Sequence, residues 1–178
     1  MNKYIPSMYK KSIFDINYNI LKNKGITSLI FDLDNTLLEK KKNVLNDETI
    51  NLLNSLKNDF KIFIMSNNIS KKRVSKASVN TSIPFLYFSL KPLSLGFKRI
   101  KRKYGISYSE MCIIGDQLLT DIYGGNKLKI YTVLVDPINS KELCVTSINR
   151  YIERKIIKKL SKLGLFERGK YYEWRKIL

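Results

Sequence analysis

Short, nearly uninterrupted apolar runs alternate along the chain with segments in which apolar residues recur every three or four positions. Such runs predict strands of a parallel sheet, because strands covered on both faces carry apolar residues at consecutive positions. The predicted strands are Ser28–Phe31, Lys61–Met65, Pro84–Leu90, Met111–Ile114 and Ile130–Val135.

The segments between these runs have helical periodicity. Helices are predicted from Asp47, from Ser70 toward Val79, from Ser94 to Tyr104, and from about Leu118 to the pair Gly124-Gly125. Ser and Asp suit helix N-termini, and the Gly after Tyr104 suits a helix end. This alternation predicts a doubly wound α/β fold: a single Rossmann-like domain with a parallel sheet of about five strands and helices on both faces.

The two ends of the chain differ from the alternating core, which we place at about 26–137 of a single domain 1–178. Residues 1–25 form a basic, tyrosine-rich lead-in, and residues 145–178 form a basic tail. In the tail, apolar residues form a stripe at helical spacing: Ile148, Ile152, Ile156 and Leu160. This helix either packs on the sheet with a solvated basic face or helps to hold the protein on anionic lipid.

The composition is strongly basic, with 33 Lys+Arg against 15 Asp+Glu and a formal net charge of +18. This excess favours nucleic acid, an anionic membrane surface or a phosphorylated substrate, although a solvated basic surface explains it equally well. Histidine is absent, which excludes Ser-His-Asp and Cys-His catalysis and His-ligated zinc. Cys112 and Cys144 lack metal-ligand spacing, so a reducing compartment is expected. No signal peptide or membrane span is visible, and we expect a cytoplasmic protein, in peripheral contact at most with the inner membrane face.

Polar residues follow four of the predicted strands at the point where each strand ends. They are Asp32 and Asp34, then Ser66 and Asn67, then Lys91, and finally Asp116 with Asp121 five residues on. In open α/β sheets ligands bind beyond the carboxyl ends of the strands. We therefore expect these side chains to form one site.

The residue types in this set suit phosphoryl transfer through a covalent carboxylate intermediate. Asp32 is best placed to attack phosphorus, and Asp34 to protonate the leaving oxygen and later to activate water. Ser66 and Lys91 would hold the phosphoryl oxygens, one by a hydrogen bond and the other by charge. Oxygen ligands for Mg²⁺, or equally for Mn²⁺, can come from Asp32, Asp116 and Asp121.

The motifs DLDNT, SNN, KP and GDQLLTD, in this order, resemble the four signature motifs of the haloacid dehalogenase (HAD) superfamily of phosphatases. The resemblance covers roughly residues 28–135. It implies that Asp32 is the nucleophile and Asp34 the general acid/base, with the Asp34 backbone carbonyl as a metal ligand. It further implies that phosphate is bound by Ser66, Asn67 and Lys91, and that Mg²⁺ is held or supported by Asp116 and Asp121. Many family members have Thr at the position of Ser66.

The connections between the motifs are short, which indicates a member without a cap domain and with an open site. The lead-in YIPSMYKKSIFDINYNILKNKGI and the tail INRYIERKIIKKL are similar to the ends of the YqeG-type branch of subclass IIIA. That branch is related to phosphatidylglycerophosphate phosphatases. The resemblance implies Mg²⁺-dependent dephosphorylation of this lipid headgroup to phosphatidylglycerol, and a basic protein suits such an anionic substrate.

Three other functions remain open at this point. A HAD phosphatase could act on nucleic-acid ends or on a small phosphorylated metabolite. A non-catalytic module could use the same fold to bind RNA, the ribosome or a membrane. The pair Asp32 and Asp34 argues against such a module, because a scaffold has no use for adjacent acids in a basic surface. The sequence does not determine the oligomeric state.

Overall fold

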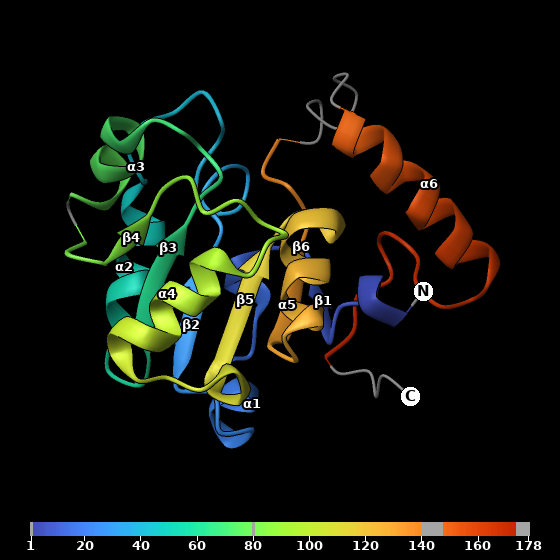
Figure 1. Ribbon diagram of the computed structural model, residues 1–178, viewed down its shortest axis with the longest axis horizontal. Helices are drawn as coiled ribbons and strands as arrows, with labels where there is room; N and C mark the ends of the chain where they lie inside the picture. The colour runs from blue at the N-terminus through green and yellow to red at the C-terminus, as the bar shows by residue number, and fades with distance from the viewer. Residues whose placement is uncertain (1, 80, 140–147, 174–178) are drawn as a thin grey trace.

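The computed structural model describes residues 2–79, 81–139 and 148–173 of the 178-residue chain. Within these ranges a six-stranded parallel sheet has the strand order β1-β6-β5-β2-β3-β4 (Figure 1). The strands are β1 Met8–Lys10, β2 Ser28–Phe31, β3 Lys61–Met65, β4 Phe85–Leu86, β5 Met111–Gly115 and β6 Tyr131–Val135. The predicted α/β class and parallel sheet are confirmed, with one strand more than the five expected.

The additional strand comes from the lead-in, where residues 8–10 pair in parallel with β6. Met8 and Tyr9 are fully buried, but a run of three residues is too short to show a strand pattern. At the opposite edge, β4 is much shorter than the predicted Pro84–Leu90. The chain leaves the extended conformation after Leu86, because Phe88 and Leu90 have φ of 47° and 55°.

In the described residues, five α-helices connect successive strands and a sixth follows the last strand. They are α1 Tyr18–Asn23, α2 Asp47–Leu56, α3 Lys71–Ser78, α4 Leu95–Tyr104, α5 Tyr123–Lys127 and α6 Ile148–Lys162. Buried apolar residues of α1, α2 and α3 pack against one face of the sheet, and buried apolar residues of α4 pack against the other face. A π-helical turn, Leu118–Ile122, precedes α5.

Two predicted helix boundaries are corrected. The N-cap of α2 is Asn46 rather than Asp47, since the Asn46 side chain accepts a hydrogen bond of 2.9 Å from the Thr49 N–H. The pair Gly124-Gly125 lies inside α5 instead of ending it. A Cβ on Gly125 would come within 2.6 Å of Ile113 and 2.7 Å of Thr132, so this glycine lets the helix approach the sheet closely.

The C-terminal helix α6 packs beside β1 and β6, at the opposite end of the sheet from α3 and α4 (Figure 1). Leu160 is fully buried in a cluster with Tyr9 and Leu134. The buried Glu153 accepts a hydrogen bond from the Leu118 N–H. Leu160 and Ile156 of the predicted apolar stripe therefore face the protein, whereas Ile152 is 39% exposed. Cys144 and the predicted tail residues 145–147 and 174–178 lie outside the described residues, and the division into lead-in, core and tail stays a prediction.

None of the helices in the described parts of the chain has the length and apolar character needed to cross a membrane.

Candidate active site

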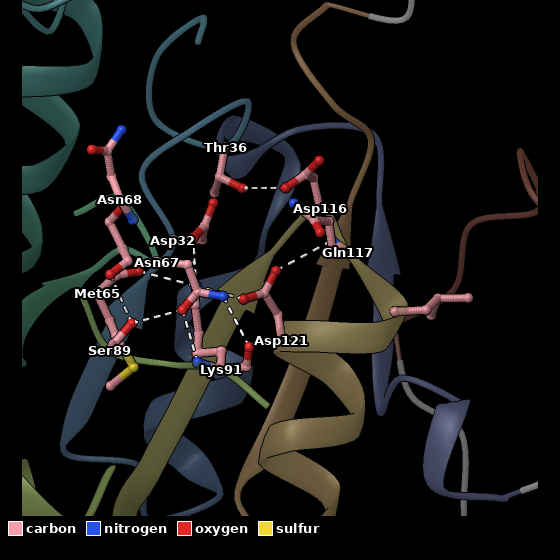
Figure 2. Close-up of polar contacts among 12 residues, drawn as sticks. Asp32, Thr36, Met65, Asn67, Asn68, Ser89, Lys91, Asp116, Gln117 and Asp121 are labelled. Carbon is pink, nitrogen blue, oxygen red and sulfur yellow. Dashed lines mark hydrogen bonds and ion pairs between the residues drawn. The ribbon is translucent and has the colours of Figure 1, made fainter. Parts of the chain in front are cut away.

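Figure 2 shows five of the predicted site residues together at the carboxyl edge of the sheet: Asp32, Asn67, Lys91, Asp116 and Asp121. Asp32 directly follows the central strand β2, and its backbone N–H donates to the Ile114 carbonyl at 2.9 Å. Ser66 follows β3, and Asp116 follows β5. Parallel strands thus bring to one edge residues that are far apart in the sequence.

Lys91 is buried at the centre of this group. Its Nζ pairs with Asp32 Oδ1, lies 2.7 Å from Asp121 Oδ1, and donates to the Met65 carbonyl at 3.0 Å. The Lys91 and Asp121 side chains are 1% and 0% exposed. A buried ammonium in such a position is stabilised only as long as its anionic partners remain.

Three buried carboxylates lie close together here, and two of them, Asp32 and Asp121, pair with the Lys91 ammonium. Carboxylate oxygens of Asp32, Asp116 and Asp121 lie within 4.8 Å of one another, and all three residues are buried. Burial raises the pKa of Asp32 well above its ordinary value, the charges of Asp121 and Asp116 raise it further, and Lys91 opposes them. Burial alone would lower the pKa of Lys91, but the charges of Asp121 and Asp32 outweigh it and the net direction is upward.

This donor set fits a divalent cation. Its ligand atoms are carboxylate oxygens, which Mg²⁺ and Mn²⁺ prefer. The cluster also depends on close packing, because a Cβ on Gly115 would come within 2.4 Å of the Asp121 carboxylate. Asp121 Oδ2 accepts from the Gln117 N–H at 3.2 Å, and Asp116 Oδ1 accepts from the Thr36 hydroxyl at 3.4 Å. These bonds orient two of the three acids.

Asp34 lies two residues beyond Asp32 and is held by a residue that the sequence analysis missed. Arg73 Nη2 is 2.7 Å from Asp34 Oδ1, and both side chains are largely buried. Arg73 also donates to the Lys40 carbonyl. Its position follows from Ser70, which caps α3 by accepting from the Arg73 N–H at 3.3 Å. Nothing in the basic run of residues 71–73 distinguishes this arginine before the fold is known.

Asn67 clamps the loop that carries Lys91. Its side-chain oxygen accepts from the Lys91 N–H at 2.7 Å, and its amide group donates to the Lys91 carbonyl at 2.9 Å. Ser66 Oγ accepts from the Asn68 N–H at 3.0 Å. The structure therefore places Asn67 against the lysine and Ser66 in the loop after β3, while the contact of both with phosphate stays a prediction.

Arg168, in the segment after α6, also reaches the site and was missed. It donates to the Asp116 carbonyl at 3.3 Å and pairs with Asp136 at 3.2 Å. The C-terminal segment is thereby tied to the end of β5. No sequence pattern near residue 168 indicates this contact.

Comparison with known proteins identifies the family. Residues 1–139 match the family described as mitochondrial PGP phosphatase. The chain belongs to this phosphatase family. The match covers the lead-in and all seven predicted site residues, and it ends before α6.

Two relatives of the chain support its assignment to the PGP phosphatase family. The chain is 36% identical over 162 residues to the "Probable phosphatase YqeG" of Bacillus subtilis (strain 168), with 90% of this chain and 94% of that protein covered. It is 24% identical over 177 residues to "Phosphatidylglycerophosphate phosphatase 1, chloroplastic/mitochondrial" of Arabidopsis thaliana. That alignment covers 90% of this chain but 49% of the relative, so the chain spans about half of its length.

A solved structure supports the fold alone. The crystal structure of an uncharacterized protein from Listeria monocytogenes serotype 4b superposes with a TM-score of 0.53 at 17% identity, covering 77% of this chain and 99% of that one. The HAD resemblance and its YqeG-type branch are confirmed by the family and its relatives. The protein is a HAD-type phosphatase, a phosphoric monoester hydrolase.

Proposed function

We propose that this PGP phosphatase family member hydrolyses the phosphomonoester of phosphatidylglycerophosphate to phosphatidylglycerol, through an aspartyl-phosphate on Asp32 and with Mg²⁺ bound. The observation that carries the proposal is the buried group of Asp32, Lys91, Asp116 and Asp121 at the carboxyl edge of the sheet. The name of the family and of the Arabidopsis relative point to the substrate. The net charge of +18 suits an anionic headgroup.

In the proposed reaction Asp32 attacks phosphorus as the bond to the ester oxygen breaks, and Asp34 gives its proton to that oxygen. Water then attacks the acyl phosphate, Asp34 takes its proton, and inorganic phosphate leaves with Asp32 restored. Lys91 opposes the upward shift in the pKa of Asp32 and so favours the ionised nucleophile. Mg²⁺, held by Asp32 and Asp116 with support from Asp121, would neutralise charge on the phosphoryl oxygens.

The test is phosphate release from short-chain phosphatidylglycerophosphate, dissolved as monomers, with Mg²⁺ or with a chelator. A panel of nucleotides, sugar phosphates and 3′- or 5′-phosphorylated oligonucleotides runs alongside. We expect the lipid to exceed every other substrate in kcat/KM by about tenfold or more, and the chelator to abolish turnover. Faster turnover of another panel member would reject the lipid substrate. Chelator-resistant turnover would reject the bound metal.

Replacing Arg73 by Gln is expected to lower kcat by about tenfold or more, with a smaller change in KM. The reason is that Asp34 loses the ion pair that fixes its carboxylate, and general acid catalysis depends on that orientation. The measurement is steady-state hydrolysis of the dissolved short-chain lipid. Arg73→Lys should recover part of kcat, while Lys72→Gln, exposed on the same helix, should behave as wild type. An unchanged kcat for Arg73→Gln would show that the ion pair does not serve the reaction.

A further inference from the structure

The loop that carries the buried Lys91 also carries a cluster of exposed apolar side chains. We call residues 87–95 the Lys91 loop. Four of its large apolar residues lie in solvent: Tyr87 at 38%, Phe88 at 47%, Leu93 at 52% and Leu95 at 45% exposure. Single exposed apolar residues are ordinary on protein surfaces, but a contiguous group marks an interaction site. The four residues lie within six positions of Lys91 in the sequence, and Tyr87 and Leu95 line one groove.

The backbone of the Lys91 loop fixes this arrangement. Phe88 has a φ of 47°, a left-handed conformation that is rare for a bulky residue. It is held by a hydrogen bond of 2.9 Å from the Phe88 N–H to the Asn68 carbonyl, and one of 3.1 Å from the Ser89 N–H to the Ser66 carbonyl. Strained backbone of this kind persists where the surroundings determine it, and it gathers at functional sites. The loop therefore holds Phe88 in an unfavourable backbone conformation although its ring remains exposed to solvent.

A second loop extends the apolar group. Ile69 is 77% exposed and follows Asn68, whose carbonyl accepts the hydrogen bond from Phe88. The loop after β3 and the Lys91 loop are therefore joined directly. We call Ile69 together with the four apolar residues of the Lys91 loop the apolar rim.

Positive charge lies beside the apolar rim. The edge strand β4 and helix α4 border an open groove of about 670 Å³, which Tyr87 and Leu95 line from the rim. The same groove is lined by four basic residues of α4: Lys98, Arg99, Arg102 and Lys103. Helix α4 contains no acidic residue. Apolar anchors beside Lys and Arg are the combination by which proteins bind anionic lipid surfaces.

We propose that the apolar rim is a membrane-docking surface whose occupant is an anionic phospholipid bilayer. The proposal rests on the proposed function and names the surface from which that active site would take its lipid. Lys91 lies in the same loop and pairs with Asp32. Insertion of Phe88 and Leu93 into the membrane–water interface would therefore bring Asp32 to the level of the lipid headgroups. The basic residues of α4 then lie against the anionic leaflet.

Helix α6 is the competing surface, because its basic residues also suit anionic lipid. However, part of its apolar stripe is used within the protein: Leu160 is fully buried and Ile156 packs against the same cluster, which leaves Ile152 as the exposed member of the stripe. Helix α6 lies at the other end of the sheet from α3, α4 and β4 (Figure 1). The two surfaces can therefore be tested separately, with exposed Tyr151 and Leu163 on and beside α6 as the matched control.

The first experiment measures flotation of the protein with vesicles and no substrate. Vesicles contain equal parts of phosphatidylglycerol and phosphatidylcholine, or phosphatidylcholine alone, in about 0.1 M salt. We expect wild type to prefer the anionic vesicles and the double variant Phe88→Asn/Leu93→Gln to bind them about tenfold more weakly. Asn tolerates positive φ, so the loop should keep its backbone. The control Tyr151→Asn/Leu163→Gln should bind as wild type.

The second experiment gives a gain of signal that does not depend on loss of binding. Phe88→Trp in a Trp174→Phe background leaves one tryptophan, since the chain contains a single Trp. Addition of anionic vesicles should shift its emission to the blue, and brominated lipids should quench it. Tyr151→Trp in the same background should show neither change.

The outcomes separate this proposal from the proposed function. Equal or greater loss in the α6 control, or no binding of wild type to anionic vesicles, would overturn the docking surface. Binding of single-stranded RNA that Phe88→Asn/Leu93→Gln abolishes, with vesicle binding unchanged, would overturn it in favour of nucleic acid. Failure of the proposed function appears instead as no hydrolysis of the dissolved short-chain lipid, an assay without vesicles. With both intact, the ratio of turnover on vesicle-embedded lipid to turnover on dissolved lipid should fall about tenfold in the rim variant.

Discussion

Asp32→Asn is expected to lower phosphate release by about 10⁴-fold or more, because an amide cannot serve as the attacking nucleophile. The substitution keeps the size of the side chain and an oxygen that can accept from Lys91. Lys91 also keeps its partner Asp121 at 2.7 Å. The active site should therefore retain its shape while losing its chemistry. Initial rates on the dissolved short-chain lipid, over a wide range of enzyme concentration, measure the loss.

The same variant should be no less stable than wild type when Mg²⁺ is absent. The pKa of Asp32 is raised in the folded protein, mainly by burial and then by Asp121 and Asp116 against the effect of Lys91. A carboxyl whose pKa is raised on folding costs stability as the pH rises above its unfolded pKa, with the full cost reached above its folded pKa, and Asn has no such cost. Urea unfolding of both proteins with a chelator at about pH 7.5 measures this difference in the free energy of unfolding. Turnover within tenfold of wild type, or a large loss of stability, would contradict Asp32 as a buried nucleophile.

Much of this site could be predicted because of the way in which parallel sheets are built. Each strand is a short apolar run, and the polar residue after it necessarily lies at the common carboxyl edge. The ranges Ser28–Phe31 and Lys61–Met65 agree with β2 and β3 at both ends. Asp32 and Asp116 directly follow β2 and β5 and are therefore placed by topology, whereas Lys91 lies five positions beyond β4 and is held by Asn67. For the acids at the strand ends, the prediction follows from topology alone.

What escaped prediction depends on contacts between distant segments. Strand β1 exists because Met8–Lys10 pairs with β6, more than 100 positions away. Arg168 reaches the Asp116 carbonyl across 52 positions. The end of β4 is set by the hydrogen bonds that hold Phe88 and Ser89 to the loop after β3. None of these features has a periodic or local sequence signal, so only the folded chain reveals them.

Lys91→Met is expected to cause the largest loss of stability among single substitutions in the site, about 3–5 kcal/mol in the absence of Mg²⁺. Its ammonium pairs with Asp32 and Asp121, and both carboxylates would lose this cation while buried. A loss of this size is a large share of the stability of an ordinary domain. Urea unfolding of metal-free protein measures it, with Lys72→Met, an exposed lysine, as the control that should change stability by less than about 0.5 kcal/mol.

The pH dependence of this loss separates charge from packing. Lys91 opposes the upward shift in the pKa of Asp32, so its removal raises that pKa further. A carboxyl whose pKa is raised on folding contributes stability at a pH below its unfolded pKa. This contribution is lost as the pH rises through its folded pKa. The difference between wild type and Lys91→Met should therefore be small near pH 4 and grow toward about pH 7.5. Mg²⁺ should restore part of it, because a cation that binds only the folded state stabilises that state by mass action. An equal loss at both pH values, without recovery in Mg²⁺, would mean that Lys91 acts through packing rather than charge.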